Sequence, residues 1–302
     1  MDKYIATIKE VEGIKIPLFF EDAKFLSSMH YQPKSDDIVI ASFPKSGTNW
    51  LHYTIYLIWS KGEPCKSFEE FQKTGIFMDK LGSEEVAKLS TPKLIKTHIP
   101  FEKLNYSKEA KYIYMARNPK DCAVSYYHHV CHRSGVSFDF KDFFDCYYKG
   151  ELTYGDQILH LKEWNDNRNH PNVLFMTYEE MKEDQKTAIL KIAKFLFGDL
   201  EKELQENQEI MDKIIKYSSV EECRKIIQIE KLIQHQDKEG FIKKDEGTSN
   251  KKVPDFKFVR KGIVGDWKNN LSKEQSDLLD EKAEKYLAGT DIYAYWKKLG
   301  IF

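Results

Sequence analysis

The sequence lacks the features of a secreted or membrane-spanning protein. Its five cysteines are an odd number and no two form a CxxC pair, so neither a disulfide framework nor a zinc-binding pattern is present. No run approaches the roughly 18 apolar residues of a membrane span. The first residues, MDKYIATIKEVEG, also lack the apolar core of a signal peptide. We therefore expect free thiols in a reducing compartment, a cytoplasmic location and no membrane partner.

A surplus of either charge is also missing. Forty-seven Lys and Arg against 48 Asp and Glu give a formal net charge of −1, which disfavours nucleic acid as a partner and makes any anion site local. The chain does have 41% hydrophobic and 14% aromatic residues over 302 positions, which is ample for a buried core. Because the chain contains no internal repeat and no break in composition, we predict a single domain over residues 1–302.

Short apolar runs alternate with helical patterns along the chain. Strand patterns cover 37–43, 93–98, 111–117 and 172–178, and helical patterns cover 46–60, 120–133 and 186–198. Gly198 is a stop signal for the last helix. In the first helix one face carries Trp50, Tyr53, Thr54, Leu57 and Ile58. The pattern predicts an α/β fold whose central, mostly parallel sheet is covered by helices on both faces.

One later segment, residues 234–253, loses this periodicity. It reads QHQDKEGFIKKDEGTSNKKV and gathers Gly, Ser, Asn and charged residues. Two interpretations remain open, a surface loop and a lid over a pocket, and both predict mobility.

Basic or titratable residues follow three of the predicted strands. Lys45 follows the first strand, Lys96 and His98 close the second, and Arg117 closes the third. One such residue alone is most often a solvated loop charge. The carboxyl ends of parallel strands, however, meet at one edge of a sheet, where ligands bind. Together these residues predict a basic pocket for a highly charged anion.

The segment IVIASFPKSGTNW, residues 38–50, is an apolar run that ends in a turn with Lys and Gly before a helix. Such a turn is typical of an anion held at a helix N-terminus. It is not the GxxxxGK[ST] loop, because the Lys precedes a single Gly by two places. Magnesium chemistry would also need a carboxylate at a strand end, and only Glu179 and Glu180 offer one. A P-loop-like turn in a metal-free transfer fits better, and a metal-dependent nucleotide or small-molecule kinase is the alternative.

Four segments resemble the cytosolic sulfotransferases, which transfer a sulfonate from 3′-phosphoadenosine 5′-phosphosulfate (PAPS) to a hydroxyl or amine. FPKSGTNWL (43–51) resembles the 5′-phosphosulfate loop and KTHIP (96–100) the catalytic segment. ARNPKDCAVSYYHH (116–129) resembles the 3′-phosphate-binding strand and helix, and RKGIVGDWKN (260–269) the C-terminal signature. The resemblance implies a PAPS-dependent sulfotransferase that needs no metal and releases 3′-phosphoadenosine 5′-phosphate (PAP).

The resemblance also implies which residues bind the donor, whose charge of about −4 suits fixed cations and N–H groups. The 5′ end would contact Lys45, Ser46, Gly47, Thr48 and Asn49. The 3′-phosphate would contact Arg117, Ser125, Arg260, Lys261 and Gly262, and the adenine would contact Trp50, Tyr178 and Ser218. The family commonly has Phe on the second face of the adenine, where this chain has Val220, which implies one-sided stacking.

The catalytic residues implied by the resemblance are His98, Lys45 and Lys96. Histidine titrates near neutral pH, so His98 suits a general base for the acceptor hydroxyl. The two lysines would neutralise charge that grows on the leaving oxygen. A second alternative is a protein that binds the adenosine nucleotide without turnover.

The acceptor is indicated only as a class. An apolar, aromatic pocket favours a phenol, an aromatic amine with a phenolic hydroxyl, or a steroid-like alcohol. Candidate lining residues are Phe19, Phe20, Phe77, Tyr126, Phe138 and Phe140. The family's dimer motif, KxxxTVxxxE, reads KNNLSKEQSD at 268–277, where Lys273 replaces an apolar Val. We therefore expect a monomer or a weak homodimer.

Overall fold

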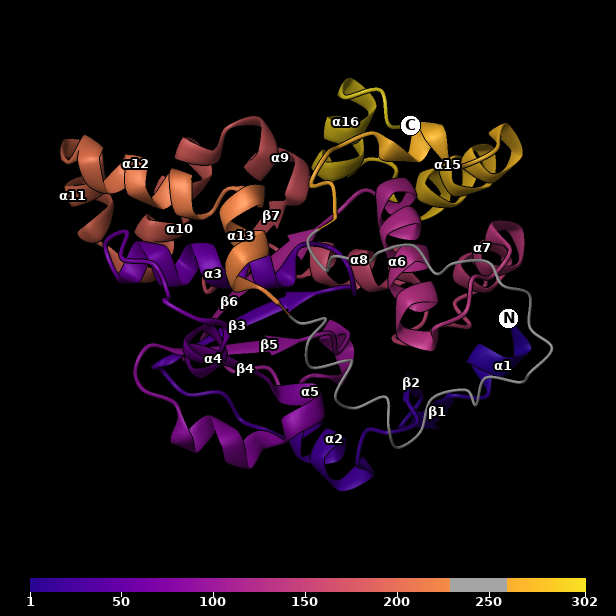
Figure 1. The fold of residues 1–302 in the computed structure, drawn as a ribbon, viewed down its shortest axis with the longest axis horizontal. Coiled ribbons are helices and arrows are strands. Elements are labelled where there is room, and N and C mark those ends of the chain that lie inside the picture. Colours follow the sequence, from indigo (N-terminus) through magenta and orange to yellow (C-terminus); the bar gives the residue numbers. More distant parts are fainter. Residues whose placement is uncertain (229–259) are drawn as a thin grey trace. The chain divides into compact units, whose positions relative to one another are not determined.

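The computed structural model describes residues 1–228 and 260–302, and their contacts form two compact units (Figure 1). Unit 1 comprises Met1–Phe20, Asn118–Lys162 and the described part of Gln228–Phe302. Unit 2 comprises Glu21–Arg117 and Glu163–Ile227. The predicted loop or lid at 234–253 lies outside the described residues. The assignment of residues 1–302 to one domain stays a prediction.

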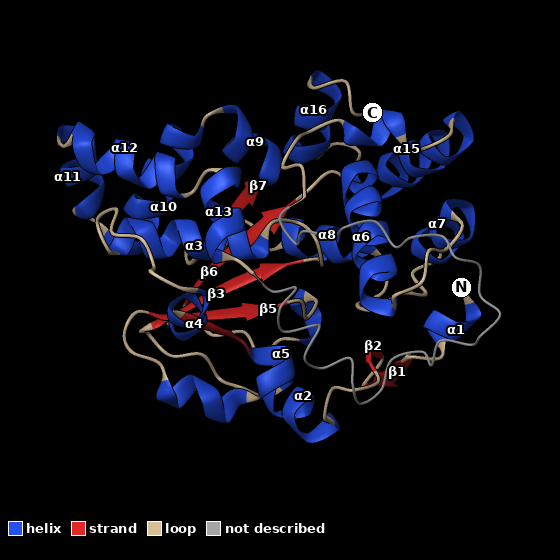
Figure 2. Ribbon diagram, in the orientation of Figure 1, coloured by secondary structure: helices blue, strands red, loops and turns tan. Residues whose placement is uncertain are grey.

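Unit 2 is built on a five-stranded parallel sheet with the order β4-β5-β3-β6-β7 (Figure 2). The strands are β3 (Asp37–Ser42), β4 (Gly75–Phe77), β5 (Lys93–Thr97), β6 (Lys111–Ala116) and β7 (Val173–Thr177). The predicted α/β fold with a parallel sheet is confirmed, and the four predicted strands each lie within one residue of the observed bounds. The edge strand β4 was not predicted, because three residues are too few to show a pattern.

Side chains cover both faces of the sheet. On one face the ring of Tyr114 stacks on Trp164 of α8 (Gln157–Asp166), with centroids 5.0 Å apart. On the opposite face Met115 lies beside Gly47, before α3 (Thr48–Trp59). Strands covered on both faces are mostly apolar, as these are.

Helix α3 is buried on more than one face. The helix is buried on most of its circumference, at Thr48, Leu51, His52, Tyr53, Thr54, Ile55, Leu57 and Ile58, whereas Trp50 is half-buried. It lies between the sheet and the helices α10 (Gln185–Phe197) and α12 (Gln208–Tyr217) (Figure 1). A helix enclosed in this way is apolar all round. The stop of α10 at Gly198, which has φ 57°, is confirmed.

The other helices of unit 2 are short. They are α2 (Asp22–Met29), α4 (Phe68–Lys73), α5 (Met78–Leu81), α9 (Tyr178–Glu183), α11 (Leu200–Glu206) and α13 (Val220–Ile226), with 3₁₀ turns at Ser83–Lys88 and Phe101–Lys103. In residues 1–228 and 260–302, no helix has the length and apolar character needed to cross a membrane.

Unit 1 contains a β-hairpin and a group of helices. The hairpin pairs β1 (Ile8–Val11) with β2 (Ile14–Pro17). The helices are α1 (Asp2–Ile5), α6 (Pro119–Ser134), α7 (Phe140–Tyr148), α15 (Lys273–Leu287) and α16 (Asp291–Lys298), with a 3₁₀ turn at Asp266–Asn269. The helix predicted at 120–133 is α6, which begins where the Asn118 side chain accepts a hydrogen bond from Asp121 N.

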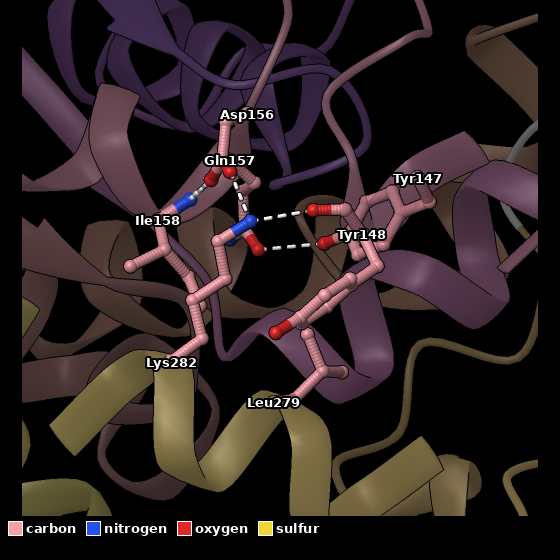
Figure 3. Close-up of a pocket in the computed structure, with 7 residues that line it drawn as sticks. All are labelled: Tyr147, Tyr148, Asp156, Gln157, Ile158, Leu279 and Lys282. Carbon is pink, nitrogen blue, oxygen red and sulfur yellow. Dashed lines mark hydrogen bonds and ion pairs between the residues drawn. The ribbon is translucent and has the colours of Figure 1, made fainter. Parts of the chain in front are cut away.

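Several of the residues that line a small pocket in unit 1 bond to one another (Figure 3). The Lys282 ammonium pairs with the Asp156 carboxylate and donates to the Tyr148 carbonyl. The Tyr147 hydroxyl donates to Gln157 Oε1 at 2.6 Å. These contacts join α15 to α7 and to the start of α8, so the residues around the pocket hold these helices together.

All five cysteines are free thiols, as predicted. Burial raises the pKa of Cys65 and of Cys223 to about 12. Thiols protonated to that degree are poor nucleophiles and metal ligands, so both cysteines behave as small apolar residues.

Candidate active site

The predicted anion-binding turn links β3 to α3. Lys45 has φ 69° and Gly47 has φ 106°, so two left-handed residues flank the buried Ser46. A turn of this kind at a helix start directs backbone N–H groups toward an anion. A Cβ at position 47 would lie 2.9 Å from Tyr178 Cδ2. Both the positive φ and the lack of space therefore require glycine there.

Lys96 lies at the carboxyl end of β5 and is buried. Its Nζ donates to Asn49 Oδ1 at 3.1 Å and lies 5.4 Å from the centroid of the Phe71 ring. Burial lowers the pKa of Lys96 from 10.5 to about 7, because the ammonium loses water and gains no carboxylate. Its charge therefore changes near neutral pH.

The imidazole of His98 has a defined tautomer. Its Nδ1 lies 2.6 Å from the Ser42 carbonyl, which can only accept, so Nδ1 carries the proton and Nε2 carries the lone pair of the neutral ring. The Ser42 hydroxyl lies 2.6 Å from the Thr48 hydroxyl. Ser42 therefore contacts both the histidine and the first residue of α3.

A second group of predicted residues meets on the same turn. The Arg117 guanidinium donates to the Lys45 carbonyl at 3.0 Å and lies 4.5 Å from the centroid of the Tyr178 ring. Trp50 meets Tyr178 edge to face, with centroids 5.1 Å apart. Trp50 Nε1 donates to the Ser218 carbonyl at 2.8 Å. An arginine, two aromatic rings and the turn thus form one cluster.

The Ser218 hydroxyl is used within the protein. It donates to the Ile214 carbonyl at 2.5 Å and accepts from Gln185 Nε2 at 2.6 Å, in a fully buried place. Val220, the first residue of α13, follows two positions later. A ligand-binding role for Ser218 and one-sided stacking at Val220 both stay predictions.

The remaining predicted donor residues belong to unit 1. Ser125 is half-buried on α6, and Gly262 has φ 64°. Arg260 and Lys261 pair with the Asp266 carboxylate at 2.6 and 2.7 Å. Burial acts to raise the pKa of Asp266, but hydrogen bonds from the two cations outweigh it and lower the pKa to about 2. The phosphate-binding role of all four residues stays a prediction.

The structure brings eleven of the predicted site residues into unit 2: Lys45, Ser46, Gly47, Thr48, Asn49, Trp50, Lys96, His98, Arg117, Tyr178 and Ser218. It also adds two residues that the sequence did not indicate, Ser42 and Asp79, which hold His98. Ser42 directly precedes the FPKSGTNW motif and acts through its carbonyl. Asp79 lies in no motif, so no sequence signal marks it.

The two carboxylates on which the kinase alternative depends lie in α9. Glu180 Oε2 accepts from Thr177 N at 2.9 Å and Glu180 N donates to Thr177 Oγ1 at 3.0 Å, which makes Glu180 part of a helix capping box. Across residues 1–228 and 260–302, no cluster of three or more His, Cys, Asp and Glu side chains is arranged to hold a metal ion. The structure thus gives Glu180 a local structural role.

Sequence comparison decides the family. The chain matches the sulfotransferase domain family over residues 35–291. It belongs to the sulfotransferase family. Human Sulfotransferase 1E1 is 31% identical over 301 residues, covering 94% of each chain. Dog Sulfotransferase 1B1 is 32% identical over 299 residues, again covering 94% of each chain.

Structural comparison agrees. The crystal structure of mouse sulfotransferase SULT7A1 complexed with PAP is 28% identical, has a TM-score of 0.74, and covers 97% of this sulfotransferase and 99% of that chain. The predicted family and fold are confirmed. The predicted enzyme class, a PAPS-dependent sulfotransferase, is confirmed with them.

Proposed function

We propose that this sulfotransferase moves a sulfonate from PAPS to the hydroxyl or amine of a small phenolic or alcohol acceptor, with His98 as the general base. The observation that carries the proposal is the bond from His98 Nδ1 to the Ser42 carbonyl at 2.6 Å. This bond makes Nε2 the basic nitrogen. Ser42 also contacts Thr48, so the base lies beside the turn that would hold the donor.

The residues of the turn suit a phosphosulfate. Gly47 leaves no room for a side chain, and its positive φ suits a backbone that wraps an anion. Arg117 is buried on the Tyr178 ring and would hold a phosphate by charge-assisted hydrogen bonds. The PAP bound by the mouse relative supports this use of the site.

The bound donor would supply the sulfonate and a leaving bridging oxygen. His98 Nε2 would accept the proton of the attacking hydroxyl, which makes its oxygen a better nucleophile. The ammonium groups of Lys45 and Lys96 would offset charge growing on the bridging oxygen. Little covalent help is needed in such a transfer, so the residues act through position and charge.

For the acceptor we propose a phenol, an aromatic amine with a phenolic hydroxyl, or a steroid-like alcohol, and for the location the cytoplasm. Phe77, one of the predicted pocket residues, supports an aromatic acceptor because its ring lies 5.0 Å from the His98 ring. An acceptor ring held there would bring its hydroxyl close to the base.

We expect the protein to be a monomer or a weak homodimer. Ser272 caps α15, and Lys273 pairs with Asp277 on its exposed first turn. A charged residue thus lies where the family's dimer motif has an apolar one, which weakens a small interface. Sedimentation equilibrium should show mainly monomer at micromolar concentration. A tight dimer lost on changing residues 268–277 would contradict this expectation.

The donor assignment is tested by calorimetric titration with PAP and, separately, with ATP, both without magnesium. We expect PAP to bind tightly and ATP to bind little. Arg117→Ala should raise the Kd for PAP by about 10–100-fold, because it removes charge-assisted hydrogen bonds to a phosphate.

Arg168→Ala is the matched control for Arg117→Ala. Arg168 also lies over an aromatic ring, 5.1 Å from the centroid of Phe175, but it precedes β7 at the amino edge of the sheet. Its removal should leave PAP binding unchanged. No binding of PAP, or binding of ATP that needs magnesium, would overturn the proposed donor and favour the kinase.

A further inference from the structure

We infer that Asp79 is a positioning residue that fixes the general base His98; the inference rests on the proposed role of His98. Asp79 lies on α5, two residues after the end of β4, and its side chain is fully buried. Its Oδ2 accepts the backbone N–H of His98 at 2.8 Å. Aspartate is rarely buried to this degree unless it is paired or hydrogen-bonded.

The end of β4 explains why a side chain is needed there. The pairing of β4 with β5 ends where Phe77 faces Lys96, and the chain then turns into α5. His98 directly follows the last residue of β5, so its N–H lies beyond the last pair of this ladder. The Asp79 carboxylate supplies the acceptor, and a carboxylate bond to an N–H is stronger than a neutral one.

Two bonds then fix the histidine from opposite ends. Asp79 holds its backbone, and the Ser42 carbonyl holds its ring at Nδ1. The bond from Nδ1 to the Ser42 carbonyl persists only while the backbone of His98 stays in place, because the backbone N–H and the ring each have a fixed acceptor. Asp79 therefore controls where Nε2 lies relative to the turn, although it does not itself touch the reacting atoms.

A neighbouring hydrogen bond offers a matched control. The Ser28 hydroxyl of α2 donates to the carbonyl of Met78, the residue before Asp79, at 2.6 Å in a buried place. Ser28→Ala removes one buried bond to α5 and leaves the bond to His98 in place. It reports what a loss of stability in α5 does by itself.

The first test is steady-state kinetics of the full chain with PAPS and 2-naphthol as the acceptor probe, because the hydroxyl of 2-naphthol still carries its proton at neutral pH. Asp79→Ala should lower kcat by about 10–100-fold with the KM for PAPS unchanged, because a displaced base loses alignment. Asp79→Asn keeps an acceptor oxygen and should retain most of kcat. Ser28→Ala should lower the thermal midpoint and leave kcat unchanged.

The second test needs no acceptor. In ¹⁵N NMR of histidine-labelled protein, with His98→Gln to assign the signal, the wild-type ring should be protonated at Nδ1. Asp79→Ala should give a mixture of tautomers, while Asp79→Asn and Ser28→Ala should keep the Nδ1 form. A merely structural role for Asp79 would not change the tautomer.

The outcomes separate this inference from the proposed function. If His98→Gln abolishes turnover while Asp79→Ala keeps both kcat and the Nδ1 tautomer, the role of Asp79 is overturned and the base stands. If His98→Gln keeps turnover, the proposed base is wrong, and the catalytic role of Asp79 is overturned with it.

Discussion

Replacing His98 with Gln is expected to lower kcat by about 10²–10⁴-fold, which is the usual contribution of a general base. Glutamine is similar in length and places its amide near the position of Nε2, but it has no basic nitrogen. Binding of PAP should be unchanged, because no donor-binding role is proposed for His98. Turnover of PAPS with 2-naphthol and calorimetry with PAP measure the two effects separately.

His170→Gln is the control for this substitution. His170 is also half-buried and packs on aromatic rings, 5.0 Å from that of Tyr106. It precedes β7, at the amino edge of the sheet, so turnover should be normal. Near-normal turnover in His98→Gln would show that another group takes the proton. A loss of PAP binding equal to the loss of turnover would show that His98 binds the donor.

The sequence was sufficient to predict the sheet and the residues at its carboxyl edge. Strands covered on both faces are mostly apolar, so β3, β5, β6 and β7 are visible as short runs. The parallel arrangement then places Lys45, His98 and Arg117 at one edge, since each follows or closes a strand. Topology links these residues, although they are far apart in the chain.

The contacts that orient the site were not predictable, because they depend on tertiary structure. Asp79 acts on a backbone N–H, and any residue other than proline at position 98 would offer the same donor. The burial of α3 comes from α10 and α12, more than 120 residues away in the sequence. The pairing of Arg260 and Lys261 with Asp266 was also missed, because the resemblance indicated only their use toward a ligand.

Binding of PAP is expected to weaken with rising pH, by up to about tenfold per pH unit between about pH 7 and pH 9. Burial lowers the pKa of Lys96 to about 7, so above that pH the free protein holds this lysine neutral. A bound polyanion favours the ammonium form, so binding must take up a proton that becomes scarcer as pH rises. Phosphate groups are fully ionised in this range and do not oppose the trend.

The variant Lys96→Met should remove this pH dependence and bind PAP as weakly as the wild type does at high pH. Lys93, at the amino end of the same strand, pairs with Asp36, and the variant Lys93→Met should keep the pH dependence.

The stability of the folded protein should change with pH in the direction opposite to PAP binding. The unfolded chain holds the Lys96 proton up to about pH 10.5 and the folded chain only to about 7, so the contribution of Lys96 to the free energy of unfolding rises with pH between them. Calorimetry and urea unfolding of both variants measure the two trends. A Kd for PAP that is constant with pH in the wild type would show that Lys96 does not face the donor.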